Sequence, residues 1–469
     1  MRENWKNHFS EWYNDIIERA QILDTRYPVK GHYVWFPYGF KLRKHVLNVI
    51  GGILDEMGHE EALFPLLVPE HEFAKEAKHI HGFEDQVYWV THGGLDKLNV
   101  KLALRPTSET AIYPMFVVWI RSHADMPLKI YQIVNVFRHE TKHTRPLIRL
   151  REITTFIEAH TAHATAKDAD TQAKEAIEAY KKFFDTLGVP YTITRRPDWD
   201  KFPGAEYTIA FDTIFPDGKV LQIGTVHNLG QNFAKTFDIT FEDLNGEQEH
   251  VHQTCYGISD RCISALITTH GDDKGLCIMP EVAPIQCVII PIWYKEKQDK
   301  INQEVRKLES ELDGIRVRVD KRDVRPGSKY FDWEIKGVPL RIELGPKDIK
   351  EKKVTVVRRD TGKKDSILRK DVKAGVLKVL DEISRDLKSR AQTEFNKKIH
   401  ESTSLKEAAK IVKGGKGIVR AGWCGDRACA DKIEGTDVAI LGILEDGASG
   451  SCIGCKQPVK AIIQMGKSY

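Results

Sequence analysis

Residues 129–160 read KIYQIVNVFRHETKHTRPLIRLREITTFIEAH, in which a basic loop joins two strand patterns. The first strand, over 129–137, delivers Arg138 and Glu140 to its end. Successive side chains of a strand point to opposite faces, so the second strand separates two sets. One face carries Glu152, Thr154, Phe156, Glu158 and His160, and the other carries Ile153, Thr155, Ile157 and Ala159. Only the second set is typical of a core, so the polar face predicts a cavity; an ordinary solvent-exposed face stays the alternative.

The surrounding sequence, residues 1–283, predicts an α+β domain. Amphipathic helices alternate with strands bounded by glycine and proline, at spacings too irregular for a βαβ repeat. The clearest helix covers 167–187, because Gly188 and Pro190 follow it as termination signals. A further strand is expected over 220–228.

Two smaller domains are expected after this one. Pro280 and Pro284 bracket a break, after which strands and helices predict an α/β domain over 284–386. Its expected strands are 287–291, 315–319, 340–344 and 354–357, and its expected helices are 301–312 and 372–387. A charged helical stretch over 389–413 then leads into a small cysteine-containing α+β domain.

Charge and apolar content say little about partners but argue against a membrane protein. The 469 residues carry a net charge of +4, which is too small to imply a polyanionic partner. Lysine and arginine nevertheless crowd residues 341–370, a density that suits either phosphate contacts or a solvated surface. No run of about 18 apolar residues occurs, and no apolar run follows the charges of residues 1–6. We therefore expect no membrane span, no secretory signal and a cytoplasmic location.

Four of the eight cysteines form a metal-binding pattern. They make two short-spaced pairs, Cys424 with Cys429 and Cys452 with Cys455. Without a secretory signal, this pattern predicts a structural Zn²⁺ held by four thiolates. Reduced thiols or a redox pair are the alternatives, because the first spacing is looser than the commonest CxxC. The other four cysteines lie in apolar sequence and are expected to be buried thiols.

A glycine-containing helix start lies near the end of the first domain. Gly257 precedes Ile258-Ser259-Asp260-Arg261, and a helix is expected over 262–269. The glycine lets backbone approach a ligand, and an arginine in the first turn can reach a terminal phosphate. A helix start with a surface arginine is the alternative.

Taken together, three segments resemble the ordered motifs of the class II aminoacyl-tRNA synthetases: 57–65 (MGHEEALFP), 137–140 (FRHE) and 257–261 (GISDR). Three more resemble prolyl-tRNA synthetases of the archaeal and eukaryotic type: 104–110 (LRPTSET), 224–233 (GTVHNLGQNF) and 336–348 (KGVPLRIELGPKD). The resemblance covers essentially the whole chain. It implies a catalytic domain with an antiparallel sheet over 1–283, an anticodon-binding domain over 284–386 and a zinc-binding domain over 387–469. It further implies a homodimer that activates L-proline with ATP and transfers it to tRNA(Pro).

The resemblance also implies roles for residues that would bind ATP. Arg138 would hold the α-phosphate while the carboxylate of the amino acid attacks, a task that suits the rigid fork of arginine. Glu140 would accept from the adenine amino group, and Arg261 would pair with the γ-phosphate. Arg149, Gln222 and Thr225 are further candidates for ATP contacts, and Mg²⁺ should bridge the phosphates.

Proline offers a secondary ammonium with two N–H donors, so its pocket needs oxygen acceptors and an apolar wall. Thr107 and Glu109 would supply acceptors, although Thr107 has the alternative role of capping the helix that follows. Phe156 would supply the wall. The remaining positions that match the substrate pocket of the family are Glu158, His160, Thr225 and His227.

At the tRNA end, the resemblance makes Glu334 and Arg341 readers of the two anticodon guanines, with Lys363 as a further candidate. The C-terminal Tyr469 would fold back toward the active site, with a disordered tail as the alternative. Only about a hundred residues separate the second and third motifs, so the hydrolytic insertion of bacterial-type enzymes is expected to be absent. A pocket without proofreading discriminates poorly against smaller amino acids, so alanine or cysteine would be misactivated.

Two departures from the family pattern concern the lining of the pocket. The chain is one residue longer than many relatives after Arg149, so the aromatic residue expected to stack on adenine falls near Ile153 or Thr154. Cys255-Tyr256 replaces a tryptophan that usually precedes the third motif.

Two rival functions stay open from the sequence. A threonyl enzyme would need a metal in its catalytic site, and no Cys/His set in residues 1–283 is obviously spaced for one. A tRNA-binding paralogue that has lost the chemistry is disfavoured by the presence of Arg138, Glu140 and Arg261.

Overall fold

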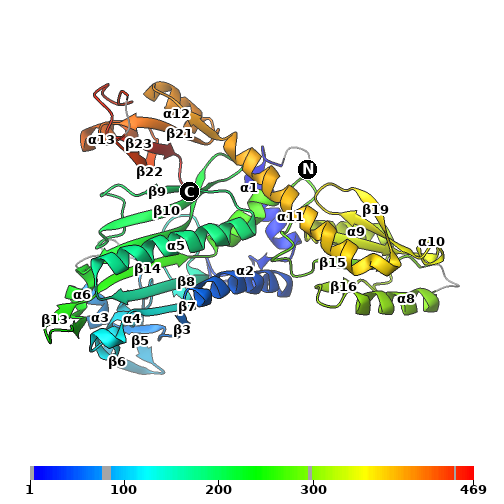
Figure 1. The fold of residues 1–469 in the computed structure, drawn as a ribbon, viewed down its shortest axis with the longest axis horizontal. Helices are drawn as coiled ribbons and strands as arrows, with labels where there is room; N and C mark the ends of the chain where they lie inside the picture. Colours follow the sequence, from blue (N-terminus) through cyan, green and yellow to red (C-terminus); the bar gives the residue numbers. More distant parts are fainter. Residues whose placement is uncertain (1–4, 77–85, 294–297, 448–449) are drawn as a thin grey trace.

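The computed structural model describes residues 5–76, 86–293, 298–447 and 450–469, which form three lobes (Figure 1). The first domain occupies the lower left of the view, and the yellow second domain lies on the right. The orange and red C-terminal domain lies above the first. The 25-residue helix α11 (Val372–Asn396) runs from the second lobe toward the third.

An antiparallel sheet forms the centre of the first domain, which confirms the expected fold class. Its strand order is β9-β10-β11-β14-β8-β7, and the short β3 pairs in parallel with β7 at the edge. The strands expected over 129–137, 152–160 and 220–228 are β7 (Leu128–Phe137), β8 (Glu152–His163) and β11 (Val220–Gly230). The other strands of this sheet are β3 (Glu60–Glu61), β9 (Thr192–Arg195), β10 (Tyr207–Ile214) and β14 (His252–Ile258).

Helix α5 (Ala166–Leu187) covers one face of this sheet and packs on β8, β11 and β14. Its apolar face joins Ile157 and Ala159 of β8 in one core, together with α1 (Phe9–Arg19), α2 (Pro37–Glu56) and α7 (Arg261–His270). The helix ends at Gly188, as predicted, with a φ of 62° that glycine adopts without strain.

A second core lies under α4 (Glu109–Trp119) and α6 (Asn232–Phe237), where aromatic side chains of both helices meet. The short elements of the domain are β1 (Leu23–Asp24), β2 (Val34–Trp35), β4 (Leu67–Pro69), α3 (Glu70–Glu76), β5 (Tyr88–Gly93), β6 (Asp96–Leu104), the 3-10 turn η2 (His123–Asp125), β12 (Thr240–Glu242) and β13 (Gln248–His250).

A β-bulge in β8 corrects the expected alternation near residue 153. Val134 of β7 pairs with Phe156 and Val136 pairs with Ile153, so three steps along β8 face two steps along β7. The extra residue places Ile153 on the cavity side with Phe156. Thr154 instead accepts a hydrogen bond of 2.8 Å from the indole of β2. The assignment of Ile153 to the core face and Thr154 to the cavity face was therefore wrong.

The second domain has a five-stranded mixed sheet in the order β16-β15-β17-β18-β19. Its first three strands are parallel, and β18 and β19 add antiparallel pairs. The strands are β15 (Cys287–Pro291), β16 (Val317–Val319), β17 (Leu340–Leu344), β18 (Lys353–Arg358) and β19 (Lys364–Leu368). The helices are α8 (Gln298–Glu311), α9 (Pro326–Ile335), α10 (Pro346–Lys350) and the 3-10 turn η3 (Arg369–Asp371). All four predicted strands of this domain are present.

Helix α11 continues past the end predicted at residue 387, because residues 376–396 contain neither glycine nor proline. The expected domain boundary near residue 386 therefore lies within a helix. The helical stretch predicted over 389–413 was wrong in its middle, where the strand β20 (Ile399–Glu401) pairs in parallel with β21 (Ile418–Trp423).

The C-terminal domain extends the catalytic sheet. The strands β20, β21, β23 (Ala461–Gly466) and β22 (Ala439–Asp446) lie side by side, and Ile443 of β22 pairs with Arg195 of β9. The result is one 11-stranded sheet across both domains. Helices α12 (Leu405–Lys413) and α13 (Arg427–Glu434) complete the domain around its own core.

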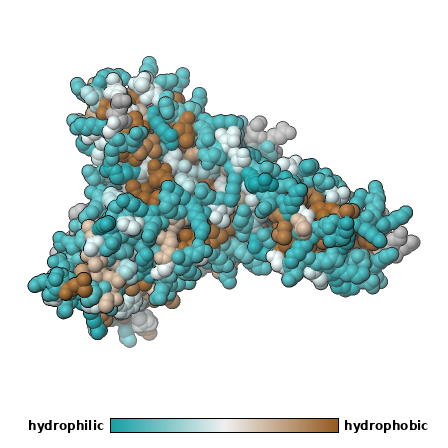
Figure 2. Space-filling model, viewed as in Figure 1, coloured by the Kyte–Doolittle hydropathy of each residue, from teal (hydrophilic) through white to brown (hydrophobic). Residues whose placement is uncertain are grey.

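Residues 141–256, all of them described, hold only the elements from β8 to β14, so no extra domain is inserted between them. Among the described residues, no helix combines the length and apolarity that crossing a bilayer requires. On the face drawn in Figure 2, hydrophobic residues form separate groups among hydrophilic ones.

Candidate active site

A cavity of about 460 Å³ opens on the face of the catalytic sheet that α5 does not cover. Its walls come from the ends of β7 and β8, from β11 and β14, from the start of α7 and from the loop after β9. Every residue predicted for the amino acid or for ATP lines this one cavity: Thr107, Glu109, Arg138, Glu140, Arg149, Phe156, Glu158, His160, Gln222, Thr225, His227 and Arg261. Glu158 and His160 are 4% and 1% exposed, so the solvent-exposed alternative for this face of β8 was wrong.

One end of the cavity is cationic. The Nε of Arg138 donates to the carbonyl of Pro106 at 2.9 Å, and the Nε of Arg261 donates to the carbonyl of Ile148 at 3.0 Å. Burial, then repulsion by Arg138 and Arg149, lowers the pKa of Arg261 to about 10. Buried arginines that repel one another form a site for a polyanion such as a triphosphate, because the negative ligand offsets their repulsion. Arg261 lies in the cavity wall, so the surface-arginine alternative was wrong.

The other end is acidic. The hydroxyl of Thr107 contacts a carboxylate oxygen of Glu109 and lies 3.1 Å from Oε1 of Glu158. One hydroxyl hydrogen cannot serve both carboxylates, so a second proton or a cation is needed between them. Burial, then repulsion by Glu109, raises the pKa of Glu158 to about 7. The hydroxyl of Thr107 does not cap α4, since the residue at the N-cap position is Ser108.

Two neutral histidines form a polar wall beside the carboxylates. The Nδ1 of His160 lies 3.1 Å from the hydroxyl of Tyr113, and the Nδ1 of His227 lies 2.8 Å from the hydroxyl of Thr208. Burial lowers both pKa values, that of His227 to about 3. Neither ring adds a positive charge near neutral pH, so the carboxylates keep the acidic end anionic.

The sequence did not reveal the buried ion pair behind the ATP side. The guanidinium of Arg196 donates to Asp212 and to the side chain of Gln222, each at 2.9 Å. It also contacts the carbonyl of Leu441 in the C-terminal domain. The pair therefore fixes Gln222 and ties the cavity wall to that domain. The only signal in the sequence was the basic pair Arg195-Arg196 before a proline.

The two residues that replace the expected tryptophan divide between the faces of the sheet. Tyr256 packs under α5, with its ring 6.1 Å from that of Tyr180. Cys255 lines the cavity. The ligand atoms of Glu109, His160 and Cys255 lie within 4.8 Å of one another. The sequence showed no such set in residues 1–283 because its members are separated by 51 and 95 positions (160 − 109 and 255 − 160).

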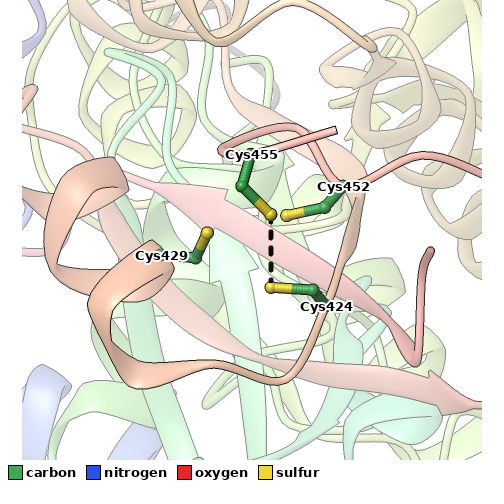
Figure 3. Close-up of side chains that lie close together, drawn as sticks. All are labelled: Cys424, Cys429, Cys452 and Cys455. Carbon is green, nitrogen blue, oxygen red and sulfur yellow. Dashed lines mark hydrogen bonds between the residues drawn. The ribbon is translucent and has the colours of Figure 1, made fainter. Parts of the chain in front are cut away.

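The side chains of the four patterned cysteines point toward one another in the C-terminal domain (Figure 3). Cys424 follows β21, Cys429 lies in α13, and Cys452 and Cys455 come from the segment before β23. Their sulfurs lie within 4.8 Å of one another, and those of Cys424 and Cys455 are 3.6 Å apart. Tetrahedral Zn²⁺ with bonds of about 2.3 Å requires roughly 3.8 Å between sulfurs, so the four thiols fit this ion. None of the eight cysteines forms a disulfide in the structure.

Two of the three predicted anticodon residues, Glu334 and Arg341, are in contact on the second domain. Arg341 of β17 donates to Glu334 of α9 at 3.3 Å and to Glu343 at 3.1 Å. Its guanidinium lies 4.0 Å from the ring of Tyr330. Lys363 lies in the turn between β18 and β19. An arginine, a carboxylate and an aromatic ring are groups that bind unpaired bases.

The C-terminal residue packs against the first domain, so the disordered-tail alternative for Tyr469 was wrong. Its hydroxyl donates to Asp217 at 2.8 Å, and its backbone N–H donates to Val220 at 3.1 Å. The ring lies 5.5 Å from the guanidinium of Arg145, in the loop between β7 and β8. Tyr469 lines a neighbouring cavity. Arg149 lines both this cavity and the main one.

Comparison with known families divides the chain into three matches. Residues 88–270 match the family described as "tRNA synthetase class II core domain (G, H, P, S and T)". Residues 286–379 match the family "Anticodon binding domain", and residues 405–469 match "Prolyl-tRNA synthetase, C-terminal".

Curated relatives resemble the chain over almost its full length. The proline–tRNA ligase of Methanothermobacter thermautotrophicus is 56% identical over 450 residues, which cover 95% of this chain and 93% of that protein. That of Methanocaldococcus jannaschii is 56% identical over 440 residues, covering 93% and 97%.

Two solved structures have the same architecture. The Giardia lamblia prolyl-tRNA synthetase in complex with prolyl-adenylate matches with a TM-score of 0.94 and 37% identity, covering 99% of both chains. The Cryptosporidium parvum prolyl-tRNA synthetase complexed with halofuginone and AMPPNP matches with a TM-score of 0.92 and 35% identity, covering 99% and 98%.

Proposed function

The chain belongs to the proline–tRNA ligases, class II synthetases that activate L-proline with ATP, and we propose that its cavity binds proline at the acidic end and ATP at the cationic end. The prolyl group of the resulting adenylate is then transferred to the 3′ end of tRNA(Pro), with release of AMP and pyrophosphate.

The observation that carries this placement is the separation of charge across one cavity. Glu109 and Glu158 both lie against the hydroxyl of Thr107 at one end, and Arg138 and Arg261 repel each other at the other end. Prolyl-adenylate has the matching order, with a secondary ammonium, a short apolar ring and then a phosphate. Phe156 fits between the two ends, because it lies two residues before Glu158 on β8, lines the same cavity and has its ring 5.6 Å from the guanidinium of Arg138.

The chemistry follows from this arrangement. A carboxylate oxygen of proline attacks the α-phosphorus of ATP, and the bond to pyrophosphate breaks in line with the attack. Arg138, oriented by its bond to Pro106, stabilises the charge that builds on the α-phosphate, and Arg261 binds the γ-phosphate. No proton has to move in this step, so neither His160 nor His227 needs to act as a base.

Glu140 is placed to accept from the adenine amino group, and Arg149, Gln222 and Thr225 complete the nucleotide side. The bulged β8 presents Ile153 to the same cavity, so the adenine would lie against an aliphatic side chain. Mg²⁺ would enter with ATP, where it neutralises phosphate charge.

The second domain would bind the anticodon of tRNA(Pro). Glu334 and Arg341 form a paired donor and acceptor set over Tyr330, which suits a guanine that is stacked and read along its edge. Lys363 would contact the backbone from the neighbouring turn. Zn²⁺ at the four cysteines fits a structural role, since four thiolates fill its tetrahedral shell.

We also propose a homodimer through the surface around residues 63–67. Leu63 is 81% exposed and Trp119 is 42% exposed, although both are large and apolar. Arg105, two residues before Thr107, donates to the carbonyls of Phe64 and Pro65 at 2.7 and 3.1 Å, so this surface is linked to the proline site. Leu63→Glu should yield a monomer in light scattering, whereas Leu95→Glu, at a fully exposed turn position, should not. A dimeric Leu63→Glu enzyme would refute the surface.

ATP–pyrophosphate exchange tests the proposed function. Exchange should require L-proline, and exchange with threonine alone, or with no amino acid, would contradict it. Arg138→Ala should lower the exchange rate by about 100- to 1000-fold while tRNA binding stays intact, because one donor to the reacting phosphate is lost. Arg121→Ala, a change of an exposed arginine in the same domain, is the matched control.

A further inference from the structure

Three metal-ligand side chains meet at the acidic end of the cavity. Glu109 lies at the start of α4, His160 lies on β8, and Cys255 lies on β14. His160 and Cys255 are direct partners across the two strands, and both project to the cavity side. All three are buried, at 2%, 1% and 6% exposed, yet each lines the cavity.

We propose that these three residues bind a second Zn²⁺ ion and that this ion competes with proline. Their ligand atoms lie within 4.8 Å of one another, and the sulfur of Cys255 is 4.0 Å from Oε1 of Glu109. A tetrahedral Zn²⁺ needs about 3.5 Å between a sulfur and an oxygen ligand, so the three ligand atoms must move closer together to bind the ion. A nitrogen, a sulfur and an oxygen together favour Zn²⁺ over Mg²⁺ or Ca²⁺.

The surroundings of His160 suit a metal ligand. Its Nδ1 is held by the hydroxyl of Tyr113 at 3.1 Å, so Nε2 is the nitrogen that a metal would take. A hydrogen bond of this kind fixes the orientation of the ring and the tautomer of a metal-bound histidine.

Glu158 is an independent sign that the cavity accepts a cation. Its side chain lines the same cavity and is 4% exposed, and its hydrogen-bond donors are the neutral hydroxyls of Thr107 and Ser108. Neutral hydroxyls do not balance the charge of a buried carboxylate, so a positive ligand at this end stabilises it.

The site would be open, unlike the cluster of four cysteines. Three protein ligands leave the fourth position of Zn²⁺ toward the cavity, as in zinc sites that bind a small molecule. With thiolate and carboxylate ligands the ion is neutralised, and Glu109 is no longer available to an ammonium. Zn²⁺ and proline therefore exclude each other. The metal site rests on geometry alone, whereas the competition rests on the proposed function.

Cobalt substitution tests the site without measuring activity. The full-length enzyme, with its four-cysteine site filled by Zn²⁺, is titrated with Co²⁺, which shows a thiolate-to-metal absorption band when cysteine binds. We expect the wild type to bind one further equivalent of Co²⁺. Cys262→Ala, which removes a buried thiol outside the cavity, should bind the same amount. Cys255→Ala should lose the band, and Tyr113→Phe should lower the affinity for Co²⁺ by about 10- to 100-fold.

L-proline added to the cobalt form should displace the ion and abolish the band. Absence of a further equivalent, or a band that persists in Cys255→Ala, would overturn the metal site. A band that appears as expected but is insensitive to saturating proline would overturn the competition and the placement of proline at Glu109, while the metal site would stand. Thermal melting of each variant shows whether the fold is kept.

Discussion

The most informative perturbation is Glu158→Gln, because it removes one of two carboxylates that proline must bridge. The raised pKa of about 7 means that the free enzyme holds a proton on the pair near neutral pH. Proline binds the ionised form, whose fraction is about 0.9 at pH 8, about 0.5 at pH 7 and about 0.1 at pH 6. The dissociation constant for proline should therefore rise about tenfold from pH 8 to pH 6, with proton release on binding.

The variant should show a different profile. At pH 8 it lacks a hydrogen bond between charged groups, worth about 1.5–3 kcal/mol, so proline should bind roughly 10- to 150-fold more weakly. Its dissociation constant should hardly change between pH 6 and pH 8. Glu152→Gln is the matched control, since this residue of the same strand lies outside the cavity lining and accepts from Asn135.

Isothermal titration calorimetry of proline without nucleotide measures both quantities, and buffers with different ionisation enthalpies report the proton release. The pH dependence of folding stability has the opposite sign to that of proline binding. A carboxyl whose pKa is raised from 4.5 to about 7 stabilises the free fold below pH 4.5, and this contribution is lost as the pH rises through 7. An equal slope in wild type and Glu158→Gln, or no slope in the wild type, would refute the reasoning.

Three further predictions address the other sites. Removal of Zn²⁺ by a strong chelator should lower the melting temperature and loosen the C-terminal domain; an unchanged melting profile, with no zinc by elemental analysis, would contradict the four-cysteine site. Arg341→Ala should weaken tRNA(Pro) binding by about 1–3 kcal/mol without changing proline-dependent exchange. A tRNA(Pro) whose anticodon lacks guanine should bind the wild-type enzyme and Arg341→Ala equally. Tyr469→Ala should raise the KM for ATP, because it removes the ring beside Arg145, whose carbonyl accepts from the backbone of Arg149; an unchanged KM would mean that the terminus only packs.

Local sequence patterns predicted most of the secondary structure. The helix α5 was predicted because it ends at Gly188, whose left-handed backbone is a local feature of the sequence and needs no contact with distant residues. The bulge in β8 was not, because the position of the extra residue depends on pairing with β7, and alternation alone assumes a regular strand. The length of α11 was underestimated because the sequence predicted a domain boundary near residue 386, where no glycine or proline ends the helix.

The candidate site divides in the same way. Arg138 and Arg261 were predicted from motifs, and the structure brings them to one cavity, although their roles in catalysis stay predictions. The convergence of Glu109, His160 and Cys255 could not be predicted from spacing, because the three residues meet only through the pairing of β8 with β14 and the docking of α4.

The most direct test is a crystal structure of the chain with a non-hydrolysable sulfamoyl analogue of prolyl-adenylate. The pyrrolidine nitrogen should lie within hydrogen-bond distance of Glu109 and Glu158, and the sulfamoyl oxygens should contact Arg138. An analogue bound outside this cavity, or one with its nitrogen at the arginines, would contradict the placement of proline and ATP.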